Sequence, residues 1–63
     1  MPLSDDAEMS SLASILDDVH HRLSVLTDRF AANKRDDVLA ALLEAERQAR
    51  AAAREIRRAN RML

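Results

Sequence analysis

In residues 26–43, LTDRFAANKRDDVLAALL, two apolar repeats that are out of phase meet, and their mismatch indicates how the chain folds. If the first repeat continued past Phe30, it would place Asp37 and Glu44 on its apolar line. One straight coiled coil through the whole chain therefore conflicts with the pattern. The break falls in AANKRDD, residues 31–37, and predicts a turn there.

On each side of this break, apolar residues recur at alternating intervals of three and four, the spacing of one face of an α-helix. The first repeat consists of Met9, Leu12, Leu16, Val19, Leu23, Leu26 and Phe30. The second repeat consists of Val38, Leu42, Ala45, Ala49, Ala52, Ile56 and Ala59. Glycine is absent and the only proline is Pro2, so nothing interrupts either helix. The sequence predicts an all-α chain with one domain, residues 1–63, comprising a first helix over about 4–32, a turn at 33–35 and a second helix over 36–62.

The residues at the expected helix starts are good capping residues. Ser4 precedes Asp5, Asp6 and Glu8, which suit the positive end of a helix dipole. Asn33, with Asp36 three positions on, resembles a capping box for the second helix.

An antiparallel hairpin explains why the second repeat is rich in alanine, because its alanines would then lie opposite the bulky residues of the first. Charge favours the same arrangement: residues 1–20 carry five acids and no Lys or Arg, whereas residues 47–63 carry six arginines and one glutamate. The alternative is a long bent or continuous helix in a coiled-coil oligomer.

A chain of 63 residues is marginal as a monomer, because small domains bury only about 60% of their unfolded surface. Four more apolar residues lie beside the two repeats, and we expect them to form an oligomer interface: Ile15, Val25, Leu39 and Leu43. Two such hairpins would cover each other in a four-helix bundle, which makes a homodimer the expected assembly. A different helical protein is the alternative partner.

Six arginines follow the outer side of the second helix: Arg47, Arg50, Arg54, Arg57, Arg58 and Arg61. Glutamates at i, i+3 or i, i+4 are expected to pair with Arg47, Arg50 and Arg58, and none of the six is expected to reach the first helix. The stripe suits a solvated face, an acidic protein partner, or the phosphates of nucleic acid. Nucleic acid is the less favoured partner, because the chain has a net charge of −1 and a single aromatic residue.

The sequence offers little for catalysis. His20 and His21 each follow an aspartate by three residues, which resembles a carboxylate-x-x-His metal motif, but most of these side chains are expected to face outward. There is no cysteine, no arrangement typical of a nucleophile, and no sign of a cofactor. The acidic N-terminal stretch does not resemble a signal peptide, and we expect a cytoplasmic protein that does not bind membranes.

These patterns together predict a small non-enzymatic module for oligomerisation or protein–protein interaction. It would be a dimeric helical hairpin that presents charged faces to a partner protein. The alternative function is a nucleic-acid-binding accessory or regulatory protein that uses the arginines of the second helix.

Overall fold

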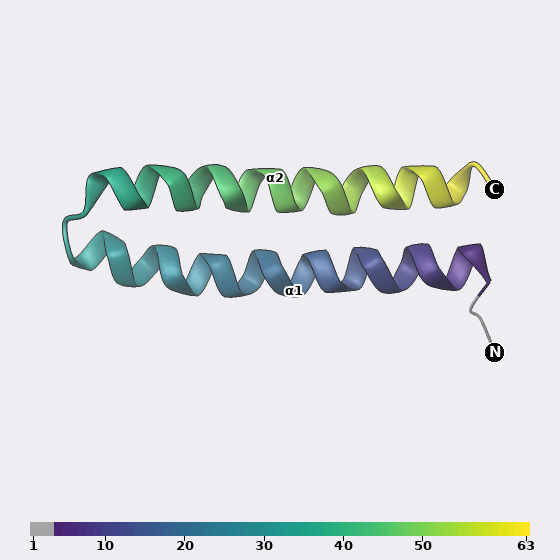
Figure 1. Cartoon of the computed structure of the whole chain (residues 1–63), viewed down its shortest axis with the longest axis horizontal. Coiled ribbons are helices and arrows are strands. Elements are labelled where there is room, and N and C mark those ends of the chain that lie inside the picture. The colour runs from purple at the N-terminus through teal and green to yellow at the C-terminus, as the bar shows by residue number, and fades with distance from the viewer. Residues whose placement is uncertain (1–3) are drawn as a thin grey trace.

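The chain folds as an antiparallel hairpin of two helices (Figure 1) in a computed structural model that describes residues 4–63. Helix α1 runs over Asp5–Ala32 and helix α2 over Asp36–Arg61. The two helices lie side by side along their whole length, so the described ends of the chain lie together, opposite the turn. The prediction of an all-helical hairpin is confirmed, and the alternative of a continuous rod is wrong.

The start of α1 follows the sequence prediction. The Ser4 hydroxyl accepts a hydrogen bond from the Ala7 amide at 3.2 Å, and Asp5, Asp6 and Glu8 lie in the first turn. This cap satisfies one of the amides that a helix leaves without a partner, and the acids interact favourably with the helix dipole.

The turn is built differently from the prediction. Asn33 ends α1, where its amide donates to the Phe30 carbonyl at 3.1 Å, so its predicted role as the cap of α2 is wrong. Arg35 occupies the N-cap position of α2 and makes no side-chain capping bond. Lys34 reverses the chain with φ at 57°, in the left-handed region that usually takes glycine or asparagine. The turn is therefore short and locally strained.

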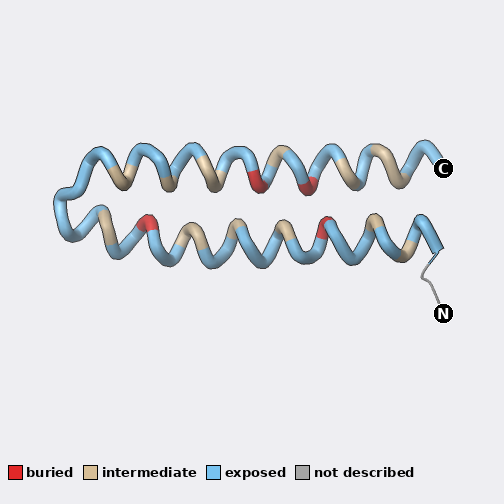
Figure 2. The backbone as a smooth tube through the Cα atoms, in the orientation of Figure 1, coloured by how far each residue is buried: buried red, intermediate tan, exposed pale blue. Residues whose placement is uncertain are grey.

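The core of the hairpin is thin (Figure 2). The buried residues among 4–63 are small: Ala13, Thr27, Ala49 and Ala53. Among residues 4–63, no large side chain is completely buried. Because alanine buries little apolar surface, the contact between α1 and α2 provides close approach rather than a large hydrophobic core.

The residues that face the opposite helix repeat at the spacing expected for a seam, but only half of them are those of the sequence prediction. On α1 they are Met9, Ala13, Leu16, His20, Leu23, Thr27 and Phe30, all buried or half-buried. On α2 they are Leu39, Leu42, Glu46, Ala49, Ala53, Ile56 and Asn60, with the same burial. In α1, Ala13, His20 and Thr27 take the seam positions that were predicted for Leu12, Val19 and Leu26, each one residue further along the chain. In α2 the same step replaces Val38, Ala45, Ala52 and Ala59, of which Ala52 is exposed and the other three are half-buried.

This difference has a simple geometric meaning. In each helix, one of the two heptad rows of the observed seam matches the prediction, and the other lies one residue further along the chain. Each residue advances about 100° around a helix, so the centre of the predicted apolar stripe lies about 50° away from the direction of the neighbouring helix. The stripes of α1 and α2 both turn toward the same face of the hairpin. In a square arrangement of four helices the central axis lies about 45° from the line that joins two neighbours, which is close to this rotation.

Candidate interaction surface

One side of the hairpin is closed by polar contacts between the helices. The Ser24 hydroxyl donates to Glu46 Oε1 at 2.5 Å, and the Thr27 hydroxyl lies 2.7 Å from Glu46 Oε2 and 2.8 Å from the Leu23 carbonyl. His20 Nε2 lies 4.0 Å from Glu46 Oε1. The Glu46 side chain is only 15% exposed, so this carboxylate is held against α1 by its hydroxyl partners.

The same side carries an ion pair between the helices. Arg57 donates to both oxygens of Asp17, at 3.3 and 2.5 Å. The expectation that no arginine of α2 reaches α1 is therefore wrong, because a long guanidinium side chain spans the gap. We call this side, formed by Asp17, His20, Ser24, Glu46 and Arg57, the polar flank.

These contacts also shift carboxylate pKa values. Hydrogen bonds from Ser24 and Thr27 lower the pKa of Glu46 below its usual 4.5. The hydrogen bond from Arg57 lowers the pKa of Asp17 below its usual 3.8. Both carboxylates are therefore more easily ionised in the folded chain than in the unfolded one.

The opposite side of the hairpin has no such closure. Asp17 and Ser24 each follow a seam residue of α1, whereas Leu12, Val19 and Leu26 each precede one, and so lie on the other side of the helix. In α2, Arg57 follows a seam residue, whereas several alanines each precede one, so these alanines lie on the side of α2 away from Arg57. We call this side the apolar flank; it consists of Leu12, Ile15, Val19 and Leu26 of α1 and Val38, Ala41, Ala45, Ala52 and Ala59 of α2.

The large residues that α1 contributes to the apolar flank are exposed to solvent. Leu12 is 42% exposed, Ile15 55%, and Val19 and Leu26 38% each. A shallow groove among Val19, Arg22, Leu23 and Leu26 lies between these side chains. Four residues at this spacing form the type of hole that receives a side chain from a facing helix in a coiled coil.

The residues predicted for an oligomer interface do not form one patch. Ile15 belongs to the apolar flank. Leu43 precedes Arg50 and Arg57 by one and two heptads, so it lies toward the polar side of α2, and Leu39 faces α1 half-buried. Val25 is exposed on the outer side of α1. The sequence interpretation assigned Leu12, Val19 and Leu26 to the seam and missed their exposure.

The arginines of α2 are partly neutralised. Besides Arg57, Arg47 pairs with Glu44 and Arg58 pairs with Glu55 at 3.3 Å, as the sequence predicted for these two. The predicted pair of Arg50 with Glu46 is not formed, because Glu46 turns to α1. Arg50, Arg54 and Arg61 make no ion pair within residues 4–63.

His20 and His21 lie on different sides of α1. His20 is half-buried beside Glu46, and His21 is exposed. Across the part of the chain that the structure describes, no three His, Asp or Glu side chains are grouped closely enough to hold a metal ion.

Searches against family models, curated proteins and solved structures find no match to this chain. Neither α1 nor α2 has the length and apolar character needed to cross a membrane.

Proposed function

We propose that this chain is a small non-enzymatic self-association module. Two hairpins pack through their apolar flanks into a four-helix bundle and present charged outer faces to a partner protein. The observation that carries the proposal is the rotation of both apolar stripes toward one open face, because a hairpin that worked alone would direct both stripes at its own seam.

The size of the apolar flank supports a second chain as its partner. The Cα atoms of the hairpin extend over 46 × 22 × 11 Å, so one broad face covers about 1,000 Å². A typical stable interface buries about 800 Å² on each partner. One hairpin therefore offers enough surface for a stable contact without any further element.

The weakness of the hairpin core supports the same conclusion. Its buried residues are alanines and a threonine, whereas its leucines, isoleucines and valines remain partly in water. Burying Leu12, Ile15, Val19 and Leu26 would add several kcal/mol per chain at about 25 cal/mol per Å². Association would thus supply the large hydrophobic core that the single hairpin lacks.

The arginines favour this proposal over nucleic-acid binding. Three of the six, Arg47, Arg57 and Arg58, are paired with carboxylates and so are less available to neutralise phosphates. The acids at the start of α1 also lie near the arginine-rich end of α2.

A matched pair of valine substitutions tests the proposal. Val19 on the apolar flank and Val25 on the outer side of α1 are 38% and 42% exposed, so they differ in position more than in burial. Val19→Asp would bury an unpaired carboxylate in each copy at about 2 kcal/mol or more, which weakens the dimer at least about 100-fold. Val25→Asp is expected to leave the dimer intact.

Size-exclusion chromatography with light scattering, over a concentration series, measures both variants. The proposal requires that Val19→Asp dissociates at concentrations where the unmodified chain and Val25→Asp remain dimeric. Equal behaviour of the two variants would show that the apolar flank is not the contact surface.

A further inference from the structure

The apolar flank is asymmetric in size. Four of its large residues, Leu12, Ile15, Val19 and Leu26, belong to α1, whereas α2 contributes four alanines and one larger residue, Val38, near the turn. A second copy can cover this face in two symmetric ways. Either α1 packs on the partner's α2 with both turns at the same end, or α1 packs on the partner's α1 with the turns at opposite ends.

Only the first arrangement places the large residues that α1 contributes to the apolar flank against the alanines of α2. Inside the hairpin, α1 already presents Leu16 and Leu23 to a row that includes Ala49 and Ala53. Packing the apolar flank of α1 on the alanines of the partner's α2 repeats this geometry and keeps all helix separations alike. In the second arrangement, leucines would meet leucines on one side while alanines met alanines on the other.

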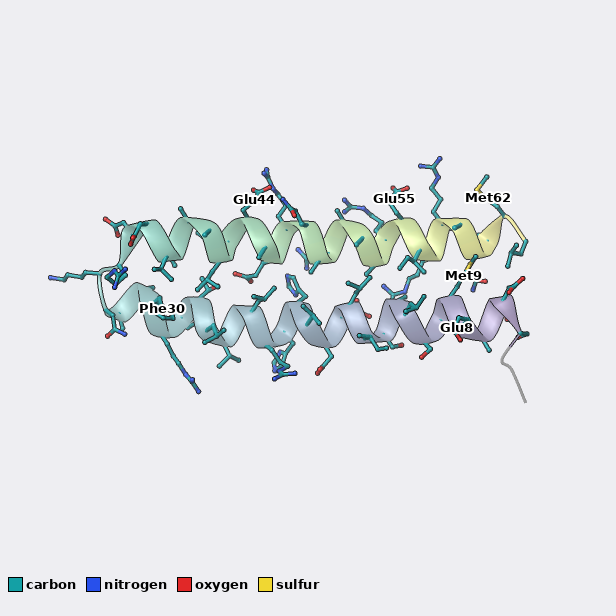
Figure 3. The ribbon with its side chains drawn as sticks, in the orientation of Figure 1. Glu8, Met9, Phe30, Glu44, Glu55 and Met62 are labelled. Atoms are coloured by element: carbon teal, nitrogen blue, oxygen red, sulfur yellow. The ribbon has the colours of Figure 1, made fainter. Side chains whose placement is uncertain are left out.

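Charge at the edges of the apolar flank points the same way. Arg22 and Arg29 occupy the same heptad row as Ile15, at the outer edge of α1, and neither makes an ion pair within residues 4–63. Glu44 and Glu55 project from α2 on the side away from α1 (Figure 3). Glu55 shares a heptad row with Ala41 of the apolar flank, and Glu44 lies beside this row on the outside of α2. Within one hairpin Glu44 pairs with Arg47 and Glu55 with Arg58, both at the surface, so Arg29 and Arg22 of a second copy would join or replace these exposed pairs.

The positions of these charged residues along the helix axes also match between α1 and the partner's α2. A two-fold axis parallel to the helices does not shift one copy along the other, so α1 meets the partner's α2 at the register of its own hairpin. Thr27 contacts Glu46, so Arg29 lies at the level of Glu44. Asp17 contacts Arg57, so Arg22 lies within about one turn of Glu55.

We infer, as a deepening of the proposed self-association, that the partner is a second copy whose α2 packs on α1, with both turns at the same end of the bundle. Arg29 then pairs with Glu44 of the other copy, and Arg22 with Glu55. The bundle has one end formed by the two turns and another where acidic starts of α1 alternate with arginine-rich ends of α2.

Distances between spin labels on single cysteines distinguish the two arrangements, since the chain contains no cysteine of its own. The label sites are Ala32, exposed at the end of α1, and Asp18, exposed near its middle. In the same-end arrangement, labels on Ala32→Cys are expected less than about 30 Å apart, because diagonal helices of a bundle are about 14 Å apart. In the opposite-end arrangement they would be separated by about 40 Å along the bundle, at ~1.5 Å per residue.

The Asp18→Cys label separates failure of the inference from failure of the proposed function. Its two copies lie close together in both arrangements, so a distance below about 30 Å reports dimer formation alone. A short Asp18 distance with a short Ala32 distance supports the inference. A short Asp18 distance with an Ala32 distance near 40 Å overturns the inference and leaves self-association standing. No defined distance at either site overturns both.

A charge reversal gives an independent readout. Arg29→Glu would turn two attractive pairs per dimer into repulsive ones, and we expect the dimer Kd to rise about tenfold at low salt. Adding Glu44→Arg to the same chain is expected to restore most of the affinity. If Arg29→Glu leaves the Kd unchanged, or Glu44→Arg does not rescue it, the paired edges are wrong.

Discussion

The close approach of α1 and α2 gives the sharpest prediction for a single side chain. Ala13 is 1% exposed and Ala53 2%, so each methyl group already fills the space between the helices. Ala53→Leu would force a larger side chain into this space, which must push the helices apart or twist the new side chain out of its preferred rotamer. Overpacking of this type costs about 1–3 kcal/mol.

In thermal unfolding, a cost of about 2 kcal/mol lowers the Tm of a domain of this size by about 8–16 °C. The matched control is Ala40→Leu, since Ala40 is exposed on the same helix and alanine and leucine have similar helix propensities. We expect Ala40→Leu to change the Tm by less than about 2 °C.

Circular dichroism at 222 nm, with all chains at one concentration, measures these changes. An unchanged Tm for Ala53→Leu would mean that the helices do not approach closely at Ala53. An equal fall for Ala40→Leu would mean that the effect comes from leucine itself rather than from the contact between helices.

The other predictions concern the turn and the polar flank. Lys34→Gly relieves a left-handed φ and is expected to raise the stability by about 0.5–1 kcal/mol, whereas Arg35→Gly, at a negative φ, is expected to lower it; urea unfolding compares them. Because the pKa of Glu46 is lower in the folded chain, its stabilisation is complete above the unfolded pKa and is lost as the pH falls through the folded one. We therefore expect the urea midpoint to fall between about pH 6 and pH 3, and to fall less in Glu46→Gln, in which Asp17 still titrates; equal falls would contradict the role of Glu46.

The sequence was sufficient to predict the hairpin. Two out-of-phase repeats gave two helices and a turn near Lys34, and the charges of the two ends gave the antiparallel direction. The turn conformation was not predictable, because neither glycine nor asparagine occupies the left-handed position, and Asn33 looked like a cap for the wrong helix.

The seam was harder to predict, for a physical reason. Apolar spacing reports the direction of the apolar stripe of a helix, and in this hairpin both stripes are turned away from the neighbouring helix. Leu12, Val19 and Leu26 fitted the repeat, so they were assigned to the contact within the hairpin. Thr27 and Glu46 were missed because polar residues carry no weight in an apolar repeat, although a hydroxyl and a carboxylate can satisfy each other across a seam.

Sedimentation equilibrium of the unmodified chain, over a range of micromolar concentrations, tests most directly whether the apolar flank is covered by a second copy. We expect a helical particle with twice the 7.1 kDa mass of one chain, which dissociates only on dilution. A particle of 7.1 kDa that retains full helicity at the highest concentration would contradict it.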